Sequence, residues 1–417
     1  MRFNKWTLGL AAVGVVSLAS VAQAEEKQMN AVQTALSSTT ISGYVSVSGW
    51  WNPGTATRGY YGEGYNNAYY PAIPYSAGKQ DGFNLDVVKL TIEKPMDENQ
   101  WAAGYKVDLL FGPDANGLNT ASQSWTEQDF CIQQAYVALR VPVGNGIDFK
   151  VGVFNSIIGY ESFDAGNNPN YTRSYGYAME PTTHTGVLAT YRFSDLVAVA
   201  AGIANTFGPT INAKAHFGGE YWYYYYGYSK AESYKTYMGS IALTAPESMG
   251  ALEGATLYGG MVNGFDAFAA EEMGASSRHN FYAGVTIPTP VAGLKLGAAY
   301  DYMGTNPQLG DSSYWANVVA AYLSWQATEK LAMHVRGEYG WNELDYPQTF
   351  SEGPVELVWP DSVIAVTATV DYNLWENVLS RLEFRWDHLA GGDFYYSARQ
   401  SWRENAFLLA ANLIYKF

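Results

Sequence analysis

Apolar and polar residues alternate with a period of two in many short segments of the chain. In the segment 101–111, the odd positions are Trp, Ala, Tyr, Val, Leu and Phe, whereas the even positions include Lys106 and Asp108. Successive side chains of a β-strand point to opposite faces, so this pattern predicts a strand with one apolar and one polar face. The pattern recurs at 294–303, 331–341 and 379–388 with the charges on one phase. We assign the apolar face to lipid and the charged face to a lumen.

Sixteen such segments can be placed, each about as long as a tilted strand that crosses a bilayer. The second is the least regular, because Asp86 and Lys89 fall on opposite phases. A β-bulge or a displaced boundary is expected there. The predicted strands are 41–51, 83–93, 101–111, 130–141, 147–154, 184–193, 196–205, 234–244, 255–264, 279–287, 294–303, 314–326, 331–341, 362–373, 379–388 and 404–417.

The connections between these strands alternate between short and long. The short ones include 142–146, 194–195 and 327–330, and the long ones include 52–82, 155–183 and 342–361. Bacterial outer-membrane barrels have short periplasmic turns and long outer loops, and an even strand count leaves both termini on the periplasmic side. The predicted fold is therefore all-β: a transmembrane antiparallel up-and-down β-barrel of about 16 strands.

The N-terminal residues have the order of a secretory signal peptide. A basic start, Met1–Lys5, precedes the apolar run 6–21 and Ala22-Gln23-Ala24. We expect cleavage after Ala24; a retained anchor helix is the alternative. The remaining chain then divides into a short periplasmic segment, 25–39, and the barrel, 40–417. Loss of Arg2 and Lys5 would change the net charge from −15 to −17, which argues against a nucleic-acid partner.

No pattern in the sequence predicts a catalytic residue, a metal site or a cofactor. The five His have no metal-type spacing, Cys131 is the single cysteine, and neither a G-x-S-x-G motif nor a phosphate-binding loop is present. We therefore do not expect an enzyme. The final strand alternates apolar residues up to Phe417 and resembles the assembly signal of bacterial outer-membrane proteins. The expected location is the outer membrane, with lipid and lipopolysaccharide as neighbours.

The third long loop, 155–183, is the main candidate functional element. A compact domain rarely keeps so long an irregular loop without a role, and a 16-stranded barrel leaves an aqueous channel unless something narrows it. We expect this loop to fold into the lumen, with Glu161, Asp164, Arg173 and Glu180 as constriction residues and with the three acids facing arginines of the wall. The predicted pore-lining residues are Lys106, Asp108, Arg140, Arg192, Arg336, Glu338, Arg381, Glu383 and Arg385. The alternative is that these charges form salt bridges between strands and never meet a solute.

Aromatic residues suggest two further features. The stretch 220–228 holds six Tyr and one Trp, which would either pack a loop onto the barrel or stack on sugars. Isolated aromatics near predicted strand ends are expected to form interfacial girdles. These are Trp50, Trp51, Tyr69, Tyr70, Tyr302, Trp315, Trp325, Trp341 and Trp386.

Short motifs in and around the third loop resemble the OmpL-like putative β-barrel porin family. They are Gly159-Tyr160-Glu161, the run 167–174 (NNPNYTRS), Pro181, His184 and Gly186, and Tyr191-Arg192-Phe193-Ser194-Asp195, with weaker patches at 41–44 and 111–115. The resemblance covers the plan of the mature chain. It implies an outer-membrane porin and transfers no catalytic or ligand residues.

The expected function is a porin for passive diffusion of small hydrophilic solutes and ions. The acidic outer loops would favour cations at the mouth. Two alternatives remain open: a substrate-selective channel, for example for sugars, and a structural or adhesive surface barrel. A homotrimer is expected by analogy of architecture alone.

Overall fold

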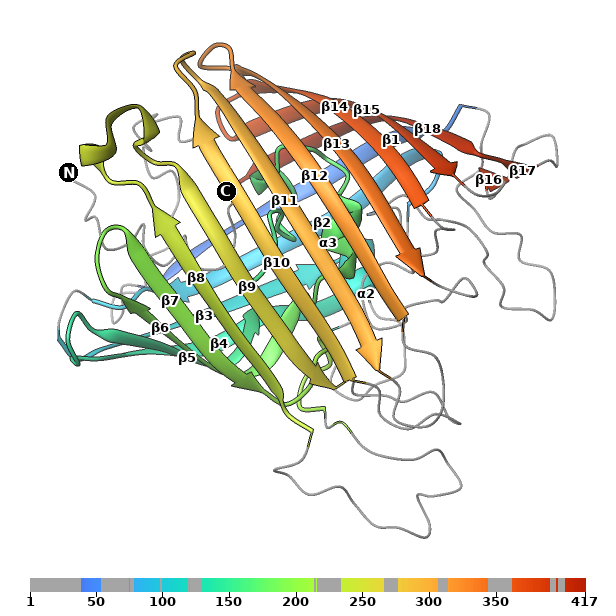
Figure 1. Ribbon diagram of the computed structural model, residues 1–417. Helices are drawn as coiled ribbons and strands as arrows, with labels where there is room; N and C mark the ends of the chain where they lie inside the picture. The colour runs from blue at the N-terminus through green and yellow to red at the C-terminus, as the bar shows by residue number, and fades with distance from the viewer. Residues whose placement is uncertain are drawn as a thin grey trace, which may run out of the picture.

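The chain folds into one closed antiparallel β-barrel of sixteen strands (Figure 1). The computed structural model describes residues 39–53, 75, 79–97, 100–118, 120, 129–213, 215, 234–265, 277–306, 314–343, 362–390, 395–396 and 402–417. The expected signal peptide 1–24, most of the segment 25–39 and the Tyr-rich stretch 220–228 lie outside the described residues.

Every predicted strand is present, with ends that differ by a few residues. The barrel strands are β1 Thr40–Trp51, β2 Gly82–Lys94, β3 Ala102–Phe111, β4 Phe130–Val141, β5 Ile147–Asn155, β6 Thr183–Arg192, β7 Val197–Ala204, β8 Thr236–Thr244, β9 Thr256–Phe265, β10 Ser277–Pro288, β11 Leu294–Asn306, β12 Tyr314–Gln326, β13 Leu331–Glu343, β14 Ser362–Trp375, β15 Val378–Ala390 and β18 Asn405–Lys416. A two-stranded hairpin, β16 Tyr395–Tyr396 and β17 Trp402–Arg403, interrupts the last outer loop and was not predicted. The predicted all-β fold is confirmed.

Each strand pairs with its neighbours in the chain, and β1 pairs with β18 to close the barrel. The closing register runs from Tyr44 opposite Lys416 to Trp51 opposite Leu409. Two backbone hydrogen bonds of 3.0 Å join Gly43 to Phe417, so the first and last strands meet at one end of the barrel. Closure leaves no free sheet edge, which a lipid environment requires because lipid offers no partner for backbone N–H and C=O groups.

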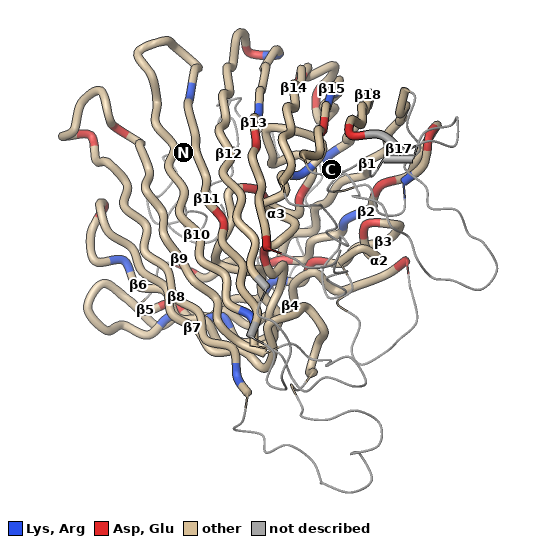
Figure 2. The backbone as a smooth tube through the Cα atoms, turned by 45° about the vertical axis from the view of Figure 1, so that its right-hand side comes forward, with Lys and Arg blue, Asp and Glu red and all other residues tan. Residues whose placement is uncertain are grey.

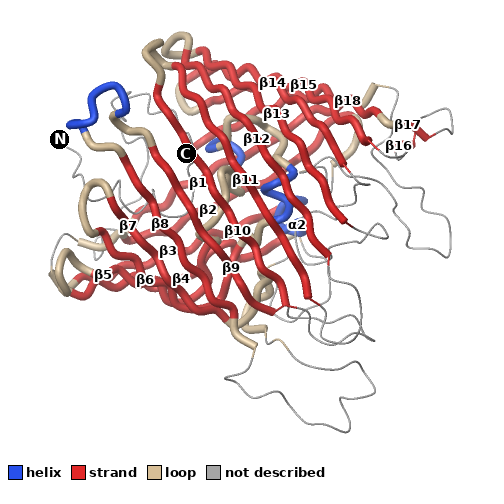
Figure 3. The backbone as a smooth tube through the Cα atoms, in the orientation of Figure 1, coloured by secondary structure: helices blue, strands red, loops and turns tan. Residues whose placement is uncertain are grey.

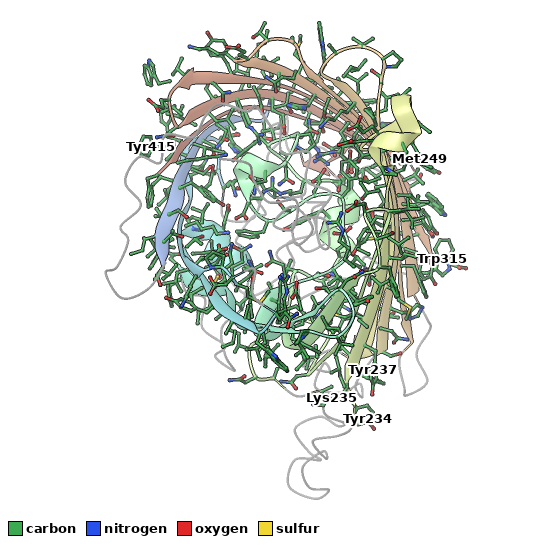
Figure 4. The ribbon with its side chains drawn as sticks, turned by 90° about the vertical axis from the view of Figure 1, so that its left-hand side faces the viewer. Tyr234, Lys235, Tyr237, Met249, Trp315 and Tyr415 are labelled. Atoms are coloured by element: carbon green, nitrogen blue, oxygen red, sulfur yellow. The ribbon has the colours of Figure 1, made fainter. Side chains whose placement is uncertain are left out.

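On the strands, exposed apolar side chains point outward from the barrel, and the buried side chains point inward. In β14, Ile364, Val366 and Val370 are exposed, whereas Val363, Thr367 and Thr369 on the opposite face are buried. Tyr237, Trp315 and Tyr415 likewise point outward from the barrel wall (Figure 4). An apolar outer surface of this kind is stable against lipid and unstable against water. No helix in the described part of the chain is long and apolar enough to cross a membrane.

The irregular second strand contains the expected bulge. Val47 pairs with Leu85 and Ser46 pairs with Val87, so Asp86 is the extra residue. The bulge lets both Asp86 and Lys89 reach the interior, where both are buried. The girdle assignment is wrong for Trp50. This side chain is 3% exposed, lies inside the barrel and donates from Nε1 to Tyr171 Oη at 2.9 Å.

Three short helices and one long loop occupy the interior (Figure 3). Helix α2, Pro113–Leu118, packs on β2–β4, and α3, Tyr175–Met179, packs on β11–β13. The 3₁₀ helix η1, Ala165–Asn167, lies in the same loop as α3, whereas η2, Glu247–Leu252, forms part of the β8–β9 turn. Small and apolar inward residues of β6–β12 form a core cluster with Ile157, Ile158 and Tyr160 of the loop.

Candidate functional site

The connection between β5 and β6, residues 156–182, is called the inner loop below. Most of its side chains are buried, and its two ends are joined by Ser156 N–H donating to Thr182 O at 2.9 Å. Asn168 closes a turn by accepting from Ser162 N–H at 2.7 Å and donating to Ser162 O at 2.6 Å. Ser174 caps α3 by accepting from Tyr177 N–H at 3.0 Å. The inner loop thus has a defined local structure before it meets the wall.

Three arginines of β13 and β15 donate to backbone carbonyls of the inner loop. Arg336 donates to Thr172 O at 2.9 Å and to Arg173 O at 3.0 Å. Arg385 donates to Arg173 O at 2.6 Å. Arg381 donates to Ala165 O at 2.8 Å and to Asn168 O at 2.6 Å. Carbonyls that no strand can pair are satisfied in this way.

Carboxylates on the same strands accept from backbone N–H groups of the inner loop. Glu383 accepts from Tyr171 N–H at 2.6 Å and from Thr172 N–H at 2.9 Å. Glu338 accepts from Tyr175 N–H at 2.6 Å. Figure 2 marks charged positions of both signs along the barrel strands. The inward charges of β15 alternate in sign and those of β13 include Arg336 and Glu338, so each strand offers donors and acceptors to one extended segment.

Buried ion pairs hold these wall charges in place. Arg336 lies 2.6 Å from Glu338 and 2.9 Å from Glu161 of the inner loop. Arg385 lies 2.8 Å from Asp387, and Arg381 lies 2.8 Å from Asp371. We call this group, Glu161, Arg336, Glu338, Asp371, Arg381, Glu383, Arg385 and Asp387, the docking network. Its side chains are nearly all buried, so they are screened little by salt.

The opposite flank of the inner loop rests on β2 and β3. Asp164 lies 2.7 Å from Lys89, which is also 3.2 Å from Asp108. Tyr44 donates to Asp164 Oδ1 at 3.3 Å. Asp108 also accepts from Thr91 Oγ1 at 2.7 Å and from the Gln134 side-chain amide at 2.8 Å. Asp108 therefore supports the loop through Lys89 and is fully buried.

Arg173 links the inner loop to other outer loops. Its guanidinium donates to Tyr171 O at 2.6 Å and to Phe163 O at 2.8 Å, and its carbon Cζ lies 4.4 Å from the Tyr75 ring centroid. Burial raises the pKa of the Tyr75 hydroxyl well above its ordinary value, so this hydroxyl stays protonated. It donates to Asp114 of α2 at 2.6 Å.

Glu180 and Asp301 of β11 are buried acidic side chains that lie near each other. Neither has a salt bridge among the described residues. Two glycines make room for the pair: a Cβ on Gly159 would lie 2.2 Å from Glu180 Oε2, and a Cβ on Gly176 would lie 2.2 Å from Asp301 Oδ2. Two like charges are costly to desolvate together, so this pair differs from the acid–base pairs of the docking network.

The inner loop leaves part of the wall uncovered. Inward side chains of β2–β5 remain partly exposed there: Glu93 36%, Lys106 25%, Arg140 18% and Asp148 13%. Arg336, Arg381 and Arg385 are at most 2% exposed by the same measure. We call the inward residues Glu93, Lys106, Tyr136, Arg140, Asp148 and Lys150 the open strip.

Most of the predicted site residues separate into three groups; Asp108, paired with Lys89, and Glu180 fall outside them. Arg336, Glu338, Arg381, Glu383 and Arg385 contact the inner loop, together with the loop residues Glu161, Asp164 and Arg173. Lys106 and Arg140 lie in the open strip, paired with Glu93 at 3.0 Å and with Asp148 at 2.6 Å. Arg192 lies at the end of β6, 3.0 Å from the exposed Asp195. Glu161 faces Arg336 as expected, but Asp164 faces Lys89 and Glu180 faces an acid.

Among the described residues, no group of three or more His, Cys, Asp or Glu side chains could hold a metal ion. Residues 38–417 match the family model described as "Putative beta-barrel porin-2, OmpL-like". The chain belongs to this porin family. Family membership and the closed barrel together support the assignment of the protein as an outer-membrane porin. No curated protein sequence matches the chain.

Solved structures of outer-membrane barrels share the fold. The anion-selective porin of Comamonas acidovorans is 10% identical with a TM-score of 0.56, over 91% of this chain and 99% of that one. The channel DcaP of Acinetobacter baumannii is 11% identical with a TM-score of 0.54, over 93% and 100%. OmpT of Vibrio cholerae is likewise 11% identical with a TM-score of 0.54, over 93% of this chain and 100% of that one. At this identity the likeness shows the fold alone.

Several residues that build the site of this porin-family member were not among the predicted site residues. Lys89, Asp86 and Gln134 lie on strands with bulges, where simple alternation fails. Tyr171 of the inner loop, which donates to Asp86 Oδ1 at 3.0 Å, gave no signal beyond its place in the NPNYTRS run. Trp50 was assigned to the membrane interface. The break in phase between Asp86 and Lys89 was the one signal that could have located part of this group.

Proposed function

We propose that the protein forms a water-filled channel for passive diffusion of small hydrophilic solutes and ions. The observation that carries this proposal is a closed 16-stranded barrel whose charges face inward and whose open strip stays partly exposed beside a buried inner loop. Barrels of this strand number are wide enough for an aqueous path, and polar lining groups lower the cost of moving a hydrated solute. Membership in a porin family supports a channel over an enzyme.

Single-channel recording tests this proposal. Folded protein added to a planar lipid bilayer should give stepwise increases of current, each of the same size. Heat-denatured protein from the same preparation is the control and should give none. Folded protein without discrete steps would contradict the proposal and would favour a structural or adhesive barrel that only displays its loops.

A substrate-selective channel is the second candidate. The observation that favours it is the extent to which the inner loop is fixed by the docking network, because a rigid constriction can discriminate between solutes. Liposome swelling with sugars and amino acids of graded size separates the two candidates. A general pore admits small solutes faster than large ones, whatever their chemistry. A selective channel admits one chemical class faster than other solutes of the same or smaller size.

We further propose that residues 1–24 are removed during export and that the mature protein sits in the outer membrane beside lipopolysaccharide, as a homotrimer. One structure of OmpT from Vibrio cholerae, 11% identical with a TM-score of 0.54, is described as a trimer form. Mass spectrometry of protein isolated from outer membranes would test cleavage after Ala24. Light scattering in detergent would test the subunit number, and a monomer mass would refute the trimer.

A further inference from the structure

Most cations on the inner wall are neutralised by a carboxylate. The arginines of the docking network and Lys89 are paired in buried contacts, and in the open strip Lys106 pairs with Glu93 and Arg140 with Asp148. Lys150 of β5 differs. Among the described residues, its ammonium group has no hydrogen bond and no carboxylate oxygen within 4.0 Å. Within the described part of the chain, Lys150 is therefore the one cation of the open strip without an ion pair.

The described contact of the Lys150 ammonium group is with an aromatic ring and not with an anion. Its Nζ lies 5.0 Å from the centroid of the Tyr136 ring, a cation–π contact that stabilises the ammonium group and leaves its full charge in place. Its cross-strand partners are Ala138 and Leu188, which offer no acceptor side chain. Lys150 itself is only partly buried.

A second cation lies on the same row of the wall. Lys106 is directly opposite Tyr136 in the β3–β4 register, so Tyr136 has a lysine on each side. Lys106 lies 3.0 Å from Glu93 and 4.0 Å from Asp108, whereas Lys150 has neither acid within ion-pair distance. An anion at this point would give the Lys150 ammonium group the ionic partner that the described residues do not supply.

We propose that Lys150, Tyr136 and Lys106 form a binding subsite for small anions, carboxylates in particular, on the solute path. The ammonium groups supply the charge-assisted hydrogen bonds that a carboxylate accepts, and the Tyr136 ring supplies an apolar face for the rest of an organic acid. This inference rests on the proposed channel function and names its favoured solute class. It assigns the lumen an anion preference, opposite in sign to the cation attraction expected of the acidic outer loops.

Reversal potentials in a KCl gradient across a planar bilayer test the subsite. Wild-type channels should pass chloride more readily than potassium. Lys150→Glu should lower the chloride-to-potassium permeability ratio roughly threefold or more, because it reverses the sign of the charge at this position. Lys150→Gln should give an intermediate value, and Lys150→Arg should stay near wild type. Lys330→Gln is the matched control: it removes the same charge from an exposed residue of the β12–β13 turn and should leave the ratio unchanged.

Benzoate provides a second measurement that does not depend on any one variant. Millimolar sodium benzoate should reduce chloride current through wild-type channels, and the reduction should weaken in Lys150→Gln and in Tyr136→Leu but persist in Tyr136→Phe. Channels whose permeability ratio ignores Lys150→Glu and Lys150→Gln, or whose benzoate sensitivity is the same in all variants, would overturn the subsite alone. A wild-type protein without channels would overturn the proposed function and the subsite together.

Discussion

Arg336 donates from all three nitrogens of its guanidinium group, and two of them reach the inner loop. Nε donates to Glu338 at 2.6 Å, Nη1 donates to Glu161 at 2.9 Å and Nη2 donates to the Arg173 carbonyl at 3.0 Å. A planar guanidinium can make several such bonds at fixed angles, which an ammonium group cannot. One residue of β13 thereby connects two separate parts of the inner loop to the wall.

Replacing Arg336 by Gln should destabilise the folded protein strongly. Glu161 and Glu338 would remain buried without their cation, and breaking a buried ion pair from one side costs about 3–5 kcal/mol. Thermal unfolding in detergent, followed by loss of β-sheet circular dichroism, would measure the change. Arg192→Gln is the control, because its exposed bridge to Asp195 contributes at most about 1 kcal/mol. Equal losses in both variants would contradict the importance of the docking network.

At the residue scale, the sequence predicted which face of a strand a charged side chain occupies, but it did not predict which group that side chain contacts. Alternation placed Arg336, Arg381 and Arg385 inside, and all three are inside. Alternation contains no information about which backbone groups of a distant loop will lie opposite them. It also fails at Asp86, where the bulge turns an apparent outward residue into a buried acceptor for Ser46 and Ser48.

At the scale of elements, the wall charges and the inner loop form one structure. The loop has few regular hydrogen bonds of its own, so its carbonyls and N–H groups need partners inside the barrel. Arginines of β13 and β15 satisfy the carbonyls, whereas Glu338 and Glu383 satisfy the N–H groups. The inward acids and bases of β13 and β15 thus have a structural role, because they hold the inner loop. Among the described inward charges, those of the open strip are therefore the candidates for contact with a solute.

Deletion of residues 160–177 should raise single-channel conductance and admit larger solutes. This segment includes η1 and most of α3, and it spans the lumen from Tyr160, stacked on Tyr322 of β12, to Tyr171 beside Trp50 of β1. Planar-bilayer currents and liposome swelling would measure both effects. Deletion of residues within 266–276, the connection between β9 and β10, is the control and should leave the conductance unchanged. Unchanged conductance after the deletion would place the constriction elsewhere.

The sequence predicted the elements well for a physical reason. A lipid-exposed barrel needs strict alternation and full-length strands, so sixteen strands and their order could be read from period and spacing. The inner loop lacks any such period. Its length and position predicted that it would matter, but its path depends on contacts between residues more than 150 positions apart, such as Tyr175 N–H with Glu338.

At the scale of the whole molecule, the outer loops also hold one another. Tyr75 and Lys79 of the first outer loop contact Asp114 of α2, and the Tyr75 ring also lies against Arg173 of the inner loop. Three consecutive outer connections therefore share one buried cluster on the side of the barrel formed by β1–β4. This cluster lies next to the seam where the first and last strands must meet.

Asn412 of β18 joins the two ends of the chain at that seam. Its amide nitrogen donates to Ser46 Oγ and Val47 O of β1, each at 2.9 Å, and to the bulged Asp86 of β2 at 3.2 Å. Replacement by Ala should cost about 1.5–3 kcal/mol, because one of the lost hydrogen bonds is to a buried carboxylate. The temperature at which the barrel loses its resistance to SDS on gels should fall. Asn373→Ala, at an exposed position of β14, should leave it unchanged. Equal temperatures for both variants would mean that the backbone ladder alone closes the barrel.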